Sequence, residues 1–142
     1  LRGGDASKAV EGLQSVIDQQ ASDTSTIKIQ RRAKAAKAEA LAKIGKSDEG
    51  IELAKTLIAD LDLADTETNA EIYNALAAAK AESGDKLGAL LDYSHTHLMF
   101  SSNAPAHAEA LSQLASLYSE LGKPDKAAQM RAELQQRYPG LQ

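Results

Sequence analysis

The chain consists of apolar stretches with a helical period, separated by short polar turns. Within each stretch, apolar residues recur at steps of three and four, which places them on one face of a helix. Examples are Leu111, Leu114, Ala115, Tyr118 and Leu121, the series Val10, Leu13, Val16 and Ile17, and the stripe Leu87, Leu90, Leu91 and Leu98. The pattern predicts seven helices and no strands, with the helices at about residues 5–20, 25–44, 47–62, 66–83, 85–100, 104–121 and 124–138.

Four similar turns punctuate the predicted helices, and each contains a glycine: Gly4, Gly45, Gly84 and Gly122. Glycine readily adopts the left-handed conformation that ends a helix, and Asp, Ser or Pro in the same turns begins the next one. The four glycines lie 41, 39 and 38 residues apart. A period of this length is typical of stacked helical hairpins.

Length and composition agree with a helical domain. A chain of 142 residues has room for a single domain, residues 1–142, or for a short run of repeats that share one core. It contains 27 Ala and 18 Leu but only two Val. That balance favours helices and argues against an all-β fold.

Several function classes find little support in the side chains present. The absence of cysteine excludes disulfides, thiol nucleophiles and thiolate metal sites. A net charge of -4 and 4% aromatic residues argue against nucleic-acid binding. No stretch approaches 18 consecutive apolar residues, so we expect no membrane insertion. Without a G-x-S-x-G motif or a phosphate-binding glycine loop, we expect no enzymatic activity and no catalytic residues.

The sequence pattern does not predict a metal or cofactor site. His95 and His97 are two residues apart and therefore lie on nearly opposite faces of a helix, and no further ligand accompanies Asp92 and His95. An acidic segment resembles a calcium loop only faintly, because Asp65 stands where that loop requires glycine. His107 follows in another helix. Packing or surface placement is the preferred interpretation for all three histidines.

One basic cluster stands out near the beginning of the chain. It consists of Lys28, Arg31, Arg32, Lys34 and Lys37. These side chains spread around more than one face of the predicted helix and have no aromatic neighbours. A solvated helix surface is the preferred interpretation, with a phosphate- or RNA-contacting patch and a contact with upstream repeats as alternatives.

The last predicted hairpin resembles a tetratricopeptide repeat, whose pattern is W-x2-L-G-x2-Y, A-x3-F and P. The matches there are Leu111-x2-Leu114-Ala115-x2-Tyr118, the turn at Gly122, Ala127 and Pro139. Earlier hairpins match through Tyr73-x2-Leu76-Ala77, Gly84, Ala89 and Tyr93, and through Ala38, Leu41, Ile44 and Gly50. The period of 38–41 residues exceeds the 34 of that family and implies longer helices or linkers.

The resemblance implies an all-α, right-handed superhelix (an α-solenoid) of antiparallel helix hairpins. Residues 1–22 would be the second half of a truncated repeat, and 25–62, 66–100 and 104–139 would be three fuller repeats. Small residues would face one another where paired helices approach closely: Ala38, Ala77 and Ala115 on the first helices and Gly50, Ala89 and Ala127 on the second.

The resemblance also implies a non-enzymatic protein–protein interaction module or scaffold. First helices in this family line a concave groove that takes a peptide or a partner helix. The groove candidates in this sequence are Arg32, Glu39, Glu71, Asn74, Ala78, Glu109, Ser112, Gln113 and Ser116. Because Glu outnumbers Arg among them, a basic or polar extended segment is the expected partner. We expect Glu71 and Glu109 to be exposed charges.

The alternative is a structural module that self-associates, for example as a homodimer through the truncated repeat, or that docks on the rest of a longer chain. The start, Leu1-Arg2-Gly3-Gly4-Asp5, is neither a Met start nor a signal peptide, so we expect a piece of a longer protein. The ending Arg137-Tyr138-Pro139-Gly140 is similar to that of bacterial envelope tetratricopeptide proteins. This similarity favours the periplasm or cell envelope and leaves the cytoplasm open.

Overall fold

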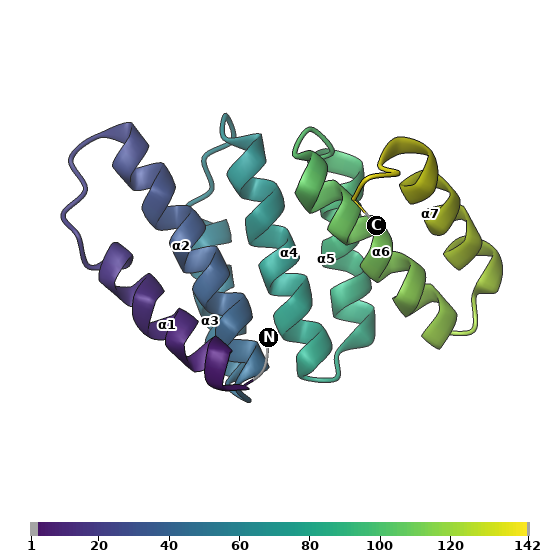
Figure 1. The fold of residues 1–142 in the computed structure, drawn as a ribbon, viewed down its shortest axis with the longest axis horizontal. Coiled ribbons are helices and arrows are strands. Elements are labelled where there is room, and N and C mark those ends of the chain that lie inside the picture. Colours follow the sequence, from purple (N-terminus) through teal and green to yellow (C-terminus); the bar gives the residue numbers. More distant parts are fainter. Residues whose placement is uncertain (1–2, 142) are drawn as a thin grey trace.

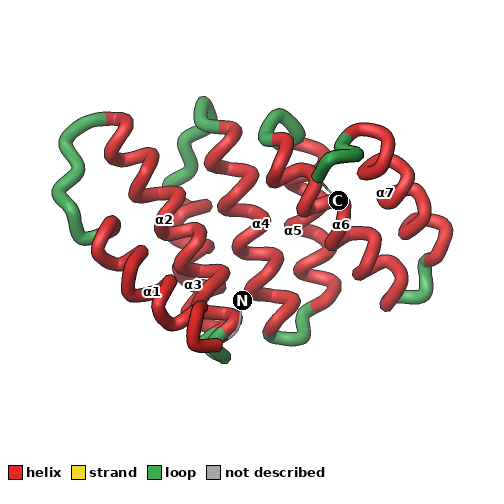
Figure 2. Tube along the Cα trace, in the orientation of Figure 1, coloured by secondary structure: helices red, strands yellow, loops and turns green. Residues whose placement is uncertain are grey.

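The computed structural model describes residues 3–141, and every regular element in that range is an α-helix. The seven helices are α1 (Gly3–Ile17), α2 (Thr24–Lys43), α3 (Ser47–Ala59), α4 (Thr66–Glu82), α5 (Lys86–Met99), α6 (Ala104–Glu120) and α7 (Pro124–Arg137). Short loops connect them (Figure 2). The predicted all-α class and helix order are confirmed for these residues, whereas Leu1, Arg2 and Gln142 lie outside the described part.

Local side-chain chemistry sets most helix boundaries. The side chains of Asp23, Asp65, Asp85 and Asn103 each accept a hydrogen bond from a backbone N–H in the first turn of the helix that follows. Gly45, Gly84 and Gly122 have φ angles of 84°, 91° and 72°, which is the left-handed conformation predicted for the turns.

Gly4, the first of the four predicted turn glycines, does not form a turn between helices. It lies in the first turn of α1 and has no positive φ angle, so the prediction that it ends a preceding helix is wrong. A left-handed glycine is needed only where one helix must stop before another begins. In the described residues no helix precedes α1, and Gly4 adopts ordinary helical geometry.

The helices form a row from α1 at one end to α7 at the other, in which α3 and α5 lie behind α2, α4 and α6 (Figure 1). Each helix packs against its neighbour in the chain, and α4 also packs against both α2 and α6. One core cluster joins α2, α3 and α4 around Ile72 and Leu57, and a second joins α4, α5 and α6 around Tyr93 and Leu114. At the end of the row, the backbone of α1 approaches only that of α2.

Small residues lie where helices pack most closely. Ala38, Ala77, Ala89, Ala115 and Ala127 are all buried, as predicted for these positions. The closest approach involves Gly50 of α3, where an added Cβ atom would lie 2.4 Å from the backbone carbonyl oxygen of Ala38. A side chain at position 50 would therefore force α2 and α3 apart.

Of the apolar stripe expected on α5, only Leu90 packs against the core, where it is half-buried. Leu87, Leu91 and Leu98 are 67%, 60% and 73% exposed, whereas Ala89 and Tyr93 of the same helix are buried. The face of α5 that carries Ala89 packs against α4, because the small Ala89 side chain lets the two helices approach closely. Among the described helices, none has the length and apolar character needed to cross a bilayer.

Candidate functional site

A groove of about 470 Å³ lies on the surface formed by α2, α4, the loop before α6 and the start of α6. These three helices are neighbours in the row of Figure 1. The lining residues are Arg32, Ala35, Ala36, Glu39, Glu67, Glu71, Asn74, Ser102, Asn103, Ala104, Pro105, Ala106 and Glu109. Its walls are therefore mostly small or polar side chains.

Five of the nine predicted groove residues line this groove: Arg32, Glu39, Glu71, Asn74 and Glu109. The other four lie outside its lining. Ser112, Gln113 and Ser116 are exposed further along α6, and Ala78 is half-buried on α4. The predicted set therefore divides into one group around the groove and a second group near the other end of the same helices.

Sequence reasoning missed the loop at 101–103, which contributes Ser102 and Asn103 to the groove. Asn103 both caps α6 and donates through Nδ2 to the carbonyl oxygen of Glu67, at 3.0 Å. The cap was recognisable, because an Asn before a Pro-containing helix start is a common signal. Its reach to α4 depends on the packing of two helices and had no local signal.

Arg32 and Glu71 form a bidentate pair across the groove. The Arg32 guanidinium donates from Nε to Glu71 Oε2 at 2.9 Å and from Nη2 to Oε1 at 2.8 Å. This geometry joins α2 to α4 and is the strongest arrangement for a guanidinium and a carboxylate. Glu71 is half-buried in this pair, so the expectation of an independent exposed charge at Glu71 is wrong.

Glu39 and Glu109 give the groove its acidic character. The pKa of Glu109 is raised, first because the concave surface keeps water from its carboxylate and second because Glu39 carries a like charge nearby. The Asn74 amide and the Lys43 ammonium offset part of this effect. Glu109 as a whole residue is exposed, as predicted. Two neighbouring carboxylates of this kind favour a cationic ligand.

Asn74 lies at the base of the groove and is only 2% exposed. Its Nδ2 atom donates to the carbonyl oxygen of Ala106 at 2.9 Å, which connects α4 to α6. Its Oδ1 atom is buried and has no hydrogen-bond partner among the described residues. A buried acceptor left without a donor is costly, so a donor from a bound molecule would stabilise this position.

The basic cluster is largely engaged in contacts between helices. Lys28 lies 3.6 Å from Asp65 and 3.5 Å from Glu67, and Arg31 donates to the carbonyl oxygen of Asp60 at 2.8 Å. Lys37 hydrogen-bonds to Gln14 Oε1 of α1, and Arg32 is held by Glu71. These contacts leave little of the cluster available as a continuous phosphate-binding surface.

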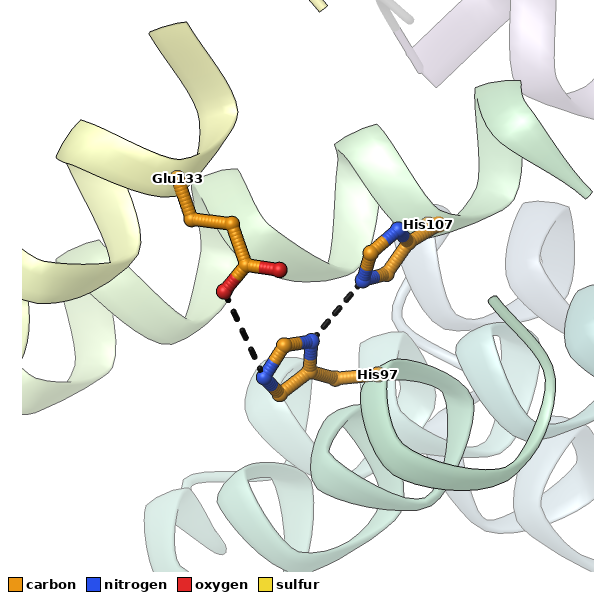
Figure 3. Close-up of side chains that lie close together, drawn as sticks. All are labelled: His97, His107 and Glu133. Carbon is orange, nitrogen blue, oxygen red and sulfur yellow. Dashed lines mark hydrogen bonds and ion pairs between the residues drawn. The ribbon is translucent and has the colours of Figure 1, made fainter. Parts of the chain in front are cut away.

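A second cluster joins three helices through His97 of α5, His107 of α6 and Glu133 of α7 (Figure 3). His97 Nδ1 and His107 Nε2 are 2.8 Å apart, and His97 Nε2 is 3.8 Å from Glu133 Oε2. The ring planes differ by 11° and the ring centres are 5.1 Å apart. Because the facing nitrogens are much closer than the centres, the rings meet edge to edge.

His107 is fully buried, and Tyr138 holds its other nitrogen. The Tyr138 hydroxyl lies 2.7 Å from His107 Nδ1. Burial lowers the pKa of His107 most, and the neighbouring His97 and Arg137 lower it further. A neutral imidazole is therefore favoured at this position at pH 7.

Sequence analysis did not find the cluster of His97, His107 and Glu133, because its members come from three different helices. The two residues considered above as possible metal ligands, His95 and Asp92, have other partners. His95 stacks on Tyr73 with ring centres 4.7 Å apart, and Asp92 lies 2.6 Å from Lys80. His95 and His97 do point to different partners: His95 stacks on Tyr73 of α4, and His97 meets His107 of α6.

A scan against protein-family models gave no match for this chain. Searches of curated proteins and of solved structures likewise found no significant match. The geometry described above therefore provides the basis for a functional proposal.

Proposed function

We propose that the chain is a tetratricopeptide-like α-solenoid, a right-handed superhelix of antiparallel hairpins. Three observations support this architecture: the turn glycines Gly45, Gly84 and Gly122 at intervals of 39 and 38 residues, the close approach of Gly50 to Ala38, and the packing of α4 against both α2 and α6. In such a solenoid α2, α4 and α6 are the first helices of successive repeats, and they form the inner surface.

The function that this arrangement supports best is non-enzymatic binding of an extended protein segment in the groove between α2, α4 and α6. The observation that carries the proposal is the placement of two carboxylates, Glu39 and Glu109, beside a buried acceptor of Asn74 in one groove. A peptide can offer a cationic side chain to the carboxylates and a backbone N–H to the Asn74 oxygen.

The expected ligand is a basic or polar segment. The groove lining contains four Glu residues and one Arg, and the Arg32 charge is already paired with Glu71. Lys28 lies near Glu67 and Lys43 lies 3.5 Å from Glu39, so Glu109 is the carboxylate of the lining that has no ion-pair partner among the described residues. An acidic segment would meet repulsion here, whereas Lys or Arg side chains would be attracted.

A display library of ten-residue peptides, selected on the purified chain, tests this proposal. We expect enrichment of Lys and Arg, and fluorescence anisotropy should show weaker binding of the selected peptides to Glu39→Gln/Glu109→Gln. The matched control is Glu49→Gln/Glu52→Gln, which removes two exposed carboxylates from α3 outside the groove lining. Equal affinity for wild type and the groove variant would place the peptide elsewhere and overturn the proposal.

The alternative, a module that self-associates or docks through the ends of the row, has one specific observation in its favour. The backbone of α1 approaches only that of α2, and Val10, Leu13, Val16 and Ile17 of α1 remain half-buried rather than buried. A second copy of the chain could cover them. Light scattering coupled to size exclusion separates the two functions: a monomer over a wide concentration range supports the groove, and a concentration-dependent dimer lost in Val16→Glu supports self-association.

A further inference from the structure

We propose that His97, His107 and Glu133 bind one divalent transition-metal ion of the zinc class and thereby connect α5, α6 and α7. One donor atom from each of the three side chains lies within 4.8 Å of the other two (Figure 3). Two imidazoles and one carboxylate form a donor set that zinc uses with water in the fourth position. This site is separate from the groove and does not depend on the function proposed for it.

Coordination requires the side chains of His97 and Glu133 to rearrange locally around His107. Two nitrogens bound to one tetrahedral zinc ion at about 2.0 Å each are separated by roughly 3.3 Å. The facing nitrogens, His97 Nδ1 and His107 Nε2, are 2.8 Å apart and aim at each other, so the His97 ring must move back and turn before both lone pairs can meet at one ion. The Glu133 carboxylate, which lies 3.8 Å from the other nitrogen of His97, must swing toward the same ion. His107 is fixed by burial, whereas the side chains of His97 and Glu133 are 18% and 31% exposed. The partly exposed pair therefore supplies both the freedom to adjust and the path of entry.

Tyr138 prepares His107 for this role. The oxygen of its hydroxyl, 2.7 Å from His107 Nδ1, can accept a hydrogen bond from the N–H of that nitrogen, which leaves the lone pair on Nε2 facing the site. Histidine ligands of metals are usually held in this way by a hydrogen bond on the far nitrogen. The ring also stands at 89° to the Tyr138 ring, which further limits its rotation.

The donor types select among cations. Ca²⁺ and Mg²⁺ prefer oxygen ligands, whereas imidazole suits Zn²⁺ and its neighbours in the first transition row. The backbones of α5 and α7 do not approach each other closely, so an ion bound by His97 and Glu133 would add a direct link between them. We therefore expect metal binding to stabilise α5, α6 and α7 against unfolding.

Isothermal titration of the metal-free chain with ZnCl₂ tests the proposal directly. We expect one ion per chain, a rise in melting temperature, and at least a tenfold loss of affinity in His97→Gln and in Glu133→Gln. His95→Gln is the matched control, because His95 lies two residues away on the same helix and stacks on Tyr73 instead. Circular dichroism checks that each variant is folded, and His107 is left intact because it is buried.

Cobalt provides a second measurement that does not depend on stability. Co²⁺ titrated in place of Zn²⁺ should give the intense visible absorption of a four- or five-coordinate ion in wild type and His95→Gln, but not in His97→Gln. No saturable binding, or equal Zn²⁺ affinity in wild type, His97→Gln and Glu133→Gln, would overturn the proposal. Loss of binding in His95→Gln alone would overturn it as well, by placing the ion at another site.

Discussion

Gly50 of α3 and Ala38 of α2 are packed so closely that a Cβ atom at position 50 would lie 2.4 Å from the Ala38 carbonyl oxygen. The obstructing atom belongs to the backbone of α2 and cannot rotate away, so the helices themselves would have to separate. This contact fixes the distance between α2 and α3.

Gly50→Ala should therefore destabilise the chain by about 1–3 kcal/mol, despite the higher helix propensity of alanine. The matched control is Gly12→Ala in α1, where an added Cβ meets no neighbouring atom within 4 Å. That change should stabilise the helix by roughly 0.5–1 kcal/mol. Urea denaturation followed by circular dichroism measures both, and a neutral Gly50→Ala would contradict the close packing of α2 and α3.

The burial of Ala127 leads to a similar prediction about close packing for α7. Ala127→Leu should cost about 1–3 kcal/mol, because the side chain is fully buried in the last pair of helices. Ala128→Leu is the control, since the neighbouring Ala128 is exposed. Thermal melts of the two variants should differ clearly, and identical melting temperatures would show that the face of α7 turned toward α6 has been misassigned.

The Arg32–Glu71 pair should contribute a small, measurable coupling. A double-mutant cycle with Arg32→Ala and Glu71→Ala is expected to give about 0.5–1 kcal/mol, because Arg32 is largely exposed and its bidentate geometry only partly offsets screening by water. Glu71→Lys should be less stable than Glu71→Ala, since it places a second cation beside Arg32. Adding 1 M NaCl should reduce the coupling, and a cycle value of zero would show that the pair has no net effect.

Binding of a basic peptide to the groove should depend on pH through Glu109. A cationic ligand favours the ionised carboxylate, so affinity is complete above the pKa of free Glu109 and is lost as the pH falls through it. Because that pKa is raised above 4.5, the loss should begin at a higher pH than for an ordinary surface glutamate. Anisotropy titrations from pH 7 to pH 4 measure this, and Glu109→Gln should reduce the acid-dependent loss to the part contributed by Glu39, while Glu52→Gln retains all of it.

Helix α1 should open before the helices in the middle of the row. Its backbone approaches only α2, and its apolar stripe is half-buried, so fewer contacts oppose local unfolding than in the middle of the row. Hydrogen exchange read by mass spectrometry should show less protection for α1 than for α6 in a monomeric sample. Equal protection in a proven monomer would mean that α1 is held by more than its contact with α2.

The sequence alone determined the helices and their turns, because these depend on residues only a few positions apart. Gly84 ends α4 with a left-handed φ, and the next residue, Asp85, caps α5 by accepting from the backbone of Gly88. Both features follow from the conformational freedom of glycine and the short carboxylate of aspartate. The small residues Ala38 and Gly50 could also be predicted as a close contact from their place in the repeated pattern.

Tertiary structure decided which face of each helix is covered and which distant side chains meet. On α5 a leucine stripe and an alanine-containing face were both possible packing surfaces, and close packing against α4 favours Ala89. The cluster around His107 combines side chains from three helices, so no spacing along one helix could predict it, whereas the repeat resemblance named five of the residues that line the groove around Glu109. The physical reason is that helix periodicity determines the direction of a side chain around the axis of its own helix. Which side chains of other helices lie opposite that side chain depends on how the helices pack together.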